Sequence, residues 1–265
     1  MDRRVRRLIA FPCGGDTLIG SLDEAPGATG LLIVSGGNEI RAGAHRGMAM
    51  LAATLAAEGV PVFRYDRRGI GDSSGENRGF YAARDDLLAA AAAFRAEAPH
   101  ITRLTGFGNC DAATTLALHG KAAGIARVLL ANPWVIEPVD GLPPPAAIRA
   151  HYAARLRDPA TWRRALSGGV SIGKFIRGLR RISDGSTEAG SLAATALPAI
   201  AGWGSKATVI LAEGDATAIA YADAAKRAAV APRTIVIPST SHSFARQADA
   251  AALAAAIRDL VNACE

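Results

Sequence analysis

Hydrophobic positions follow two alternating patterns along this chain. Short apolar runs predict buried strands, and longer stretches with apolar residues three or four apart predict helices. The predicted strands are residues 5–11, 17–22, 30–35, 60–65, 102–107, 127–131, 208–212 and 234–238. The predicted helices are residues 44–58, 82–97, 112–123, 216–229 and 244–262. This alternation predicts an α/β fold with a mostly parallel sheet of roughly eight strands and helices on both faces.

The periodicity weakens between Pro133 and about Ile200. Ligands of parallel sheets bind beyond the carboxyl ends of the strands, so an insertion at this point of the chain would lie over the binding site. We therefore predict a single domain over residues 1–265, with residues 133–200 as a helical cap insertion.

A cysteine occupies the turn between the predicted strand 102–107 and the helix that follows it. Residues 108–112 are Gly-Asn-Cys-Asp-Ala, which is the G-x-S-x-G nucleophile elbow with sulfur in place of oxygen and Ala in place of the last Gly. The partial positive charge of a helix N-terminus stabilises a thiolate. Cys110 is the predicted nucleophile, and the simpler interpretation is a small buried hydrophobic residue.

An acid and a histidine follow two later strands. Asp215 comes just after residues 208–212, and His242 comes just after residues 234–238. The order nucleophile, acid, histidine is that of α/β-hydrolases and differs from those of chymotrypsin-like and subtilisin-like proteases. We predict that His242 accepts the thiol proton and that Asp215 orients the imidazole. The alternative acids are Glu213, Glu137 and Asp140.

An oxyanion hole needs two backbone N–H donors. The N–H of Asp111, next to the nucleophile, is one, and the loop after Val34 offers Gly37 or Asn38 as the other. An ordinary glycine turn is the alternative interpretation of that loop. The Asp111 side chain has two predicted positions: it caps the helix, or it lies beside the thiol, where its charge disfavours a thiolate.

At these residues the chain resembles the α/β-hydrolase superfamily. Residues 66–74, Asp-Arg-Arg-Gly-Ile-Gly-Asp-Ser-Ser, are similar to its D-x-R-G-x-G-x-S loop, whose role in the family is mainly structural. Read on its own, this loop is a glycine-rich turn that makes Arg67 and Arg68 available for ion pairs or an anionic ligand. The cysteine triad also resembles that of dienelactone hydrolases.

A closer resemblance is to the first type of exosortase A system-associated hydrolases. It rests on Asn38-Glu39, on Cys110-Asp111-Ala112, and on residues 151–164, His-Tyr-x-x-Arg-Leu-x-Asp-Pro-x-Thr-Trp-Arg-Arg. Those proteins are encoded beside exosortase and exopolysaccharide genes in Gram-negative bacteria. The resemblance therefore implies a link to exopolysaccharide systems.

The middle segment is basic: residues 149–181 contain nine Lys and Arg residues and one acid. A solvated helical face is one interpretation, and attraction of an acidic substrate, a carrier or an anionic membrane surface is the other. Trp134, Arg163 and Arg164 are the predicted substrate-binding residues. No nucleic-acid recognition motif accompanies the charge, so we expect no nucleic-acid partner.

Composition narrows the class of protein. The 265 residues are 50% hydrophobic and 20% charged, with a net charge of +6, which is typical of a globular protein. Three cysteines without CxxC spacing, no signal peptide and no apolar run of spanning length predict a cytoplasmic protein. Scattered histidines and the absence of G-x-G-x-x-G predict no metal and no cofactor.

The leading functional prediction is a hydrolase or acyltransferase that forms an acyl-Cys110 intermediate from an ester or a thioester. Its substrate would be a small molecule or a carrier-bound acyl group. A catalytically silent binding or scaffold protein of the same fold is the second hypothesis, favoured by Cys in place of Ser together with Asp111. A cysteine redox sensor is the third, although the sequence offers no resolving cysteine.

Overall fold

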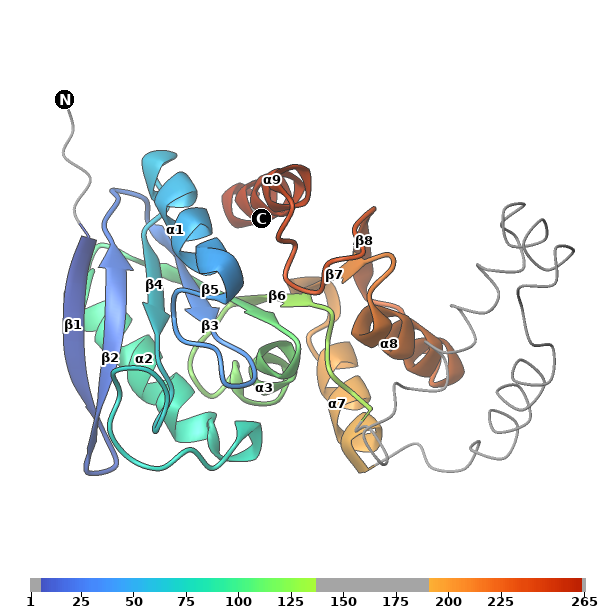
Figure 1. Ribbon diagram of the computed structural model, residues 1–265, viewed down its shortest axis with the longest axis horizontal. Coiled ribbons are helices and arrows are strands. Elements are labelled where there is room, and N and C mark those ends of the chain that lie inside the picture. The colour runs from blue at the N-terminus through green and yellow to red at the C-terminus, as the bar shows by residue number, and fades with distance from the viewer. Residues whose placement is uncertain (1–5, 137–190, 264–265) are drawn as a thin grey trace, which may run out of the picture.

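Eight strands pair into one sheet in the computed structural model, which describes residues 6–136 and 191–263 (Figure 1). The strands are β1 (Arg6–Cys13), β2 (Asp16–Asp23), β3 (Thr29–Val34), β4 (Val62–Tyr65), β5 (Arg103–Asn109), β6 (Arg127–Ala131), β7 (Ala207–Ala212) and β8 (Arg233–Ile237). Their order is β1-β2-β4-β3-β5-β6-β7-β8. Strand β2 is antiparallel to both neighbours and all other pairs are parallel, which confirms the predicted sheet.

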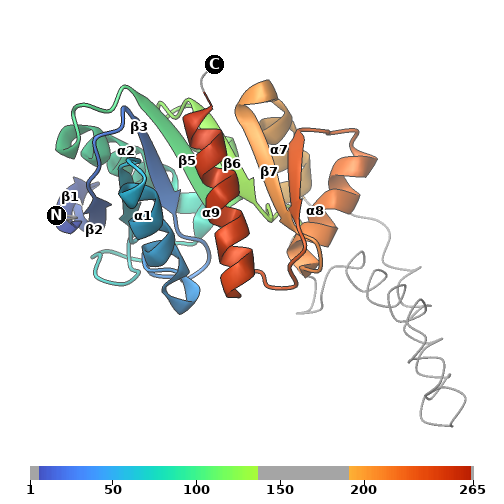
Figure 2. The same ribbon diagram turned by 90° about the horizontal axis from the view of Figure 1, so that it is seen from above.

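Helices cover both faces of this sheet (Figure 2). They are α1 (Gly47–Ala57), α2 (Arg84–Glu97), α3 (Asp111–His119), α7 (Ser191–Ala201), α8 (Ala216–Arg227) and α9 (Gln247–Asn262), with short 3-10 helices η1 (Ala44–Arg46), η2 (Phe80–Ala82) and η3 (Gly204–Lys206). Helices α1 and α9 lie together on one face, and α2, α3, α7 and α8 lie on the other.

The alternation of side chains along the central strands divides the core in two. In β3, Leu32 and Val34 contribute to the core under α2 and α3, whereas Leu31 and Ile33 contribute to the core under α1 and α9. Successive residues of a strand point to opposite faces, so a strand covered on both sides is apolar at most of its positions. This explains the mostly apolar runs from which the strands were predicted.

Helix α7 lies at the end of residues 133–200, for which the sequence predicted a helical cap without locating its helices. Its side chains Leu192, Ala196 and Ile200 are buried, and the helix packs against α3. The predicted cap, residues 133–200, included most of this helix. In the structure the helix packs into the core on the same face of the sheet as α3. The remainder of the predicted cap, except residues 133–136, lies outside the described residues.

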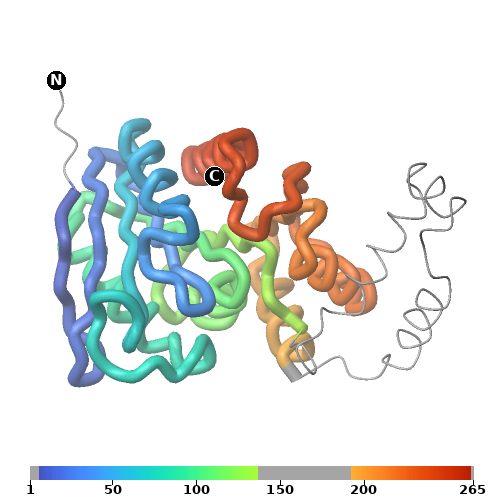
Figure 3. Tube along the Cα trace, in the orientation of Figure 1, coloured from blue at the N-terminus to red at the C-terminus, as the bar shows by residue number. Residues whose placement is uncertain are grey.

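The parallel arrangement brings distant parts of the chain to one edge of the sheet. Figure 3 traces the chain from β1 at one side of the sheet to β8 at the other. Strands β3, β5, β7 and β8 run in the same direction, so the loops that follow them meet at the carboxyl edge. Among residues 6–136 and 191–263, no helix has the length and apolar character needed to cross a membrane.

Candidate active site

Cys110 stands at a sharp turn between β5 and α3. Its backbone has φ 63° and ψ −127°, a conformation that costs a non-glycine residue about 1–3 kcal/mol. The turn is held on both sides: Cys110 N–H donates to the Ala131 carbonyl at 3.0 Å, and its own carbonyl accepts from Ala113 at 3.1 Å and Trp134 at 3.2 Å. These bonds fix the backbone of Cys110, whose side chain is half-buried, at the start of α3.

The tightness of the turn explains its small residues. A Cβ at Gly108 would lie 2.7 Å from the backbone carbon of Ala112, closer than real Cβ contacts. Ala112 is itself buried. The glycine before the cysteine is therefore required by the close approach of strand and helix.

His242 and Asp215 meet at this edge. The His242 Nδ1 atom lies 3.0 Å from Asp215 Oδ2. Asp215 is also the N-cap of α8, because the same carboxylate oxygen accepts from the Ala218 N–H at 3.0 Å. The start of α8 thus fixes the carboxylate, which in turn holds the orientation of the imidazole.

The imidazole is linked to the thiol as well. Hydrogen bonds to Asp215 and then to Cys110 raise the pKa of His242 to about 10, against the opposing effect of burial. Both neighbours favour the cationic ring. The predicted nucleophile, histidine and acid therefore lie together at one edge of the sheet.

This shift predicts a pH dependence of stability. A histidine whose pKa rises from 6.5 to about 10 on folding stabilises the protein fully below pH 6.5 and ceases to do so as the pH rises through 10. We expect the wild type to exceed His242→Gln in free energy of unfolding at pH 6.5, and the difference to shrink by pH 10. Urea unfolding at both pH values measures this; a difference that grows with pH would contradict it.

Two asparagines that the sequence analysis did not identify hold the backbone of His242. The side-chain nitrogens of Asn109 and Asn132 each donate to the His242 carbonyl at 3.1 Å. Asn132 also donates to Asn109 Oδ1 at 3.0 Å and accepts from the Ala212 N–H at 2.8 Å. Asn132 is fully buried with a φ of 40°. Both residues adjoin strand ends, which is the one signal that could have indicated them.

Further hydrogen bonds hold the loop after β8 against α9. Ser239 donates to Asp249 Oδ2 at 2.5 Å and accepts from the Ser241 N–H at 3.0 Å. The buried ring of Phe244 follows, at a φ of 53°. The position of His242 therefore depends on contacts to β5, β6 and α9 together.

The two predicted oxyanion residues in the loop after β3 differ in position. The Gly37 N–H donates to Asp111 Oδ1 at 2.7 Å, which links this loop to the elbow. Asn38 is exposed, and its side-chain oxygen accepts from Asn77 at 2.9 Å. Asp111 turns toward the loop and makes no side-chain cap hydrogen bond at the start of α3, so its predicted role as a helix cap was wrong. The contact distinguishes Gly37 from Asn38 as the residue beside the elbow.

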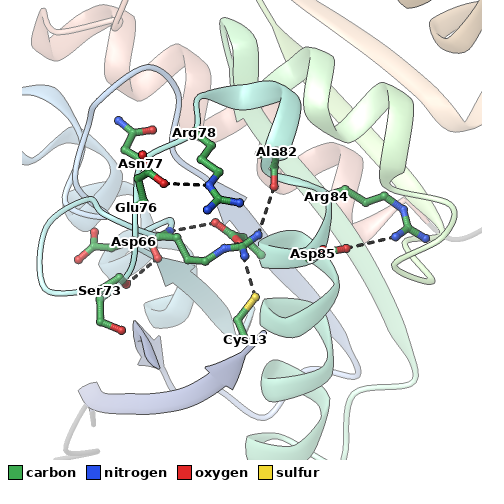
Figure 4. A network of polar contacts seen from close by, with 12 residues as sticks. Cys13, Asp66, Ser73, Glu76, Asn77, Arg78, Ala82, Arg84 and Asp85 are labelled. Carbon is green, nitrogen blue, oxygen red and sulfur yellow. Dashed lines mark hydrogen bonds and ion pairs between the residues drawn. The ribbon is translucent and has the colours of Figure 1, made fainter. Parts of the chain in front are cut away.

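The loop over residues 66–74 has a structural role. Arg68 pairs with Asp86 at 2.5 Å, and the side chain of Arg67 donates to the Gly37 carbonyl and lies 3.8 Å from Asp111. Figure 4 shows the polar network around this loop, with the thiol of Cys13 beside it. Both arginines that were predicted to be available for ion pairs are engaged within the protein.

Cys13 differs from Cys110 in its surroundings. It is buried and donates to Asp86 at 3.5 Å. Burial, with the charge of Asp86, raises the pKa of this thiol to about 11. Cys13 is therefore protonated and shielded at neutral pH. The side chain of Cys110, by comparison, is only half-buried.

The remaining predicted residues are only partly described. Trp134 is half-buried beside the elbow; its ring meets Phe80 edge-on at 5.2 Å, and its carbonyl accepts from Thr114 at 2.6 Å. The alternative acid Glu213 is exposed. The predicted residues outside the described part of the chain are Arg163, Arg164, Glu137 and Asp140. In the described ranges, His, Cys, Asp and Glu side chains form no group of three that could hold a metal.

A strained elbow on the fifth strand, with acid and histidine after the last two strands, defines the α/β-hydrolase class of fold. The chain belongs to the alpha/beta hydrolase family, whose model matches residues 31–256. Among curated proteins, none matches this sequence.

Solved structures share the fold at low sequence identity. A Pyrococcus furiosus esterase is 14% identical with a TM-score of 0.65, over 98% of this chain and 90% of its own. A dienelactone hydrolase from Anabaena variabilis is 14% identical with a TM-score of 0.62, over 97% of each chain. A serine hydrolase without a lid from Xanthomonas campestris is 15% identical with a TM-score of 0.60, over 98% of this chain and 97% of its own.

Proposed function

We propose that this protein is a hydrolase or acyltransferase that acts on an ester or a thioester through an acyl-Cys110 intermediate. One observation carries the proposal: His242 lies 3.0 Å from Asp215 and interacts with the elbow cysteine, at the carboxyl edge of the sheet. The esterase and dienelactone hydrolase among its structural neighbours agree with an acyl substrate.

The proposed reaction has two steps. The Cys110 thiolate attacks the acyl carbonyl carbon, and the carbonyl electrons move onto oxygen. When the tetrahedral intermediate collapses, the alkoxide or thiolate leaves and takes the proton of the His242 imidazolium. His242 then removes a proton from water or an acceptor alcohol, which attacks the thioester and restores the Cys110 thiolate and the imidazolium. Asp215 orients the ring in both steps and stabilises it whenever it is cationic.

The sulfur nucleophile favours particular substrates. Exchange between a thiol and a thioester is nearly balanced, and an activated ester is attacked readily. An amide is disfavoured because a thiolate leaves more easily than an amine, so the intermediate reverts. A small or carrier-bound acyl group is therefore the proposed substrate, in a reducing compartment such as the cytoplasm, since both described cysteines are free thiols. We also propose the exopolysaccharide link on the strength of residues 151–164.

The test is a panel of p-nitrophenyl esters and acyl thioesters. We expect turnover of at least one substrate and an acyl adduct on the Cys110 peptide by mass spectrometry. Cys110→Ala should abolish both, whereas the matched loss of the buried thiol in Cys13→Ser should retain turnover. Unchanged turnover in Cys110→Ala would falsify the proposal.

The second candidate, a catalytically silent binding or scaffold protein, is favoured by one contact. The Gly37 N–H, a candidate oxyanion donor, is held by the carboxylate of Asp111. A folded protein that shows neither turnover nor an acyl-Cys110 adduct across the panel would support this alternative.

A further inference from the structure

The loop after β3 and the nucleophile elbow meet through a carboxylate. The Gly37 N–H donates to Asp111 Oδ1 at 2.7 Å, and the Asp111 side chain is only 10% exposed. In the proposed reaction this N–H is the second donor to the oxygen that becomes negative. An oxygen that already carries negative charge therefore occupies the donor that the substrate oxyanion needs.

We propose that Asp111 is a resident anion of the oxyanion hole, which must leave the Gly37 N–H before Cys110 is acylated. The inference rests on the proposed function and concerns the regulation of the same site. It makes Asp111 a residue that sets the acylation rate through its side chain, in addition to the backbone N–H that it supplies at the start of α3.

The neighbouring loop accommodates this carboxylate. A Cβ at Gly36 would lie 2.6 Å from Asp111 Oδ1 and 2.6 Å from the carbonyl oxygen of Asn109. Any side chain at position 36 would therefore displace either the carboxylate or the elbow. Gly37 has a φ of 54°, a conformation natural to glycine, and this turn aims its N–H at the carboxylate.

The guanidinium of Arg67 offers the Asp111 carboxylate a second position. The other Asp111 oxygen lies 3.8 Å from Arg67 Nη2, which is longer than a hydrogen bond. Arg67 Nη1 is buried and has no hydrogen-bond partner in the described part of the chain. A movement of the carboxylate toward this guanidinium would complete a charge-assisted pair and release the Gly37 N–H for the substrate.

The proposal separates two reactions of the same thiol. Acylation by an ester passes through an oxyanion, whereas alkylation by iodoacetamide displaces iodide at a saturated carbon and forms none. A nearby charge that only alters the thiolate would change both rates in the same proportion. Occupation of the oxyanion hole would slow acylation alone.

The experiment measures both rates at Cys110 for the wild type, Asp111→Ala and Asp111→Asn. Peptide mass spectrometry follows acylation by p-nitrophenyl acetate and alkylation by iodoacetamide, so that other thiols do not interfere. Asp259→Ala, which removes an exposed carboxylate on α9, controls for the loss of one negative charge. Circular dichroism verifies that each variant is folded.

We expect the ratio of acylation to alkylation to rise about tenfold in Asp111→Ala, with a smaller rise in Asp111→Asn and none in Asp259→Ala. The asparagine fills the same space without charge, so it gives the answer if the alanine variant fails to fold. A ratio that stays constant or falls while the wild type is acylated would overturn this inference alone. If every variant is alkylated and none is acylated, the proposed function fails with it.

Discussion

Replacing His242 by alanine should lower the turnover of an activated ester by about a thousandfold or more, because both proton transfers lose their carrier. Alkylation of Cys110 by iodoacetamide at pH 7 should slow by only about tenfold, since the thiolate loses its cationic partner but the reaction needs no proton donor. The unequal losses follow from the two roles of the ring, whose hydrogen bonds reach both Asp215 and Cys110.

The measurement compares steady-state ester hydrolysis with the rate of alkylation at the Cys110 peptide. His100→Ala is a matched control, because His100 is exposed and bonds only the Ala25 carbonyl, at 3.0 Å, among the contacts described. It should leave both rates within about twofold. Turnover in His242→Ala that stays near the wild-type level would remove His242 from the mechanism.

The second large effect is expected at Asn132. Its amide makes three hydrogen bonds in a fully buried position, to Asn109, to the His242 carbonyl and from Ala212. Asn132→Ala leaves those groups unsatisfied and should lower the free energy of unfolding by about 3 kcal/mol. It should also lower kcat for ester hydrolysis about tenfold with little change in KM, because the loop that carries His242 loses an anchor.

Asn132→Gly isolates the hydrogen bonds from the backbone. Asn132 has a φ of 40°, which alanine tolerates poorly and glycine adopts readily. Urea unfolding of both variants should show similar large losses if the amide is responsible. A glycine variant as stable as the wild type would mean that backbone strain, and not the lost hydrogen bonds, destabilises the alanine variant.

Local patterns in the sequence predicted most of this fold. Mostly apolar runs indicated the strands, because a sheet covered on both faces leaves few polar positions along its central strands. The bounds of helix α7 were not predicted, since Ser191–Ala201 is mostly small residues with Pro198 inside and lacks a polar face that would mark a period. Its packing against α3 depends on the assembled fold.

Part of the candidate site could likewise be predicted from the sequence, and part could not. Cys110, Asp215 and His242 could be proposed because each follows a recognisable strand at a fixed offset, and the parallel sheet brings those ends together. The contacts of Asp111 and Asn132 could not be proposed from the sequence. Each joins residues more than twenty positions apart, through a side chain that could instead form hydrogen bonds with nearby backbone groups. Such contacts depend on the assembled fold.

Asp215 has a consequence for descendants of this chain. The same carboxylate oxygen caps α8 and orients the imidazole, and a cap of this kind is worth about 1 kcal/mol of stability whether or not any reaction takes place. A related protein that had lost its catalytic activity would still be selected to keep the aspartate for stability, whereas the histidine could be replaced by other residues. The fate of position 242 among related sequences is therefore a more telling record of catalysis than that of position 215.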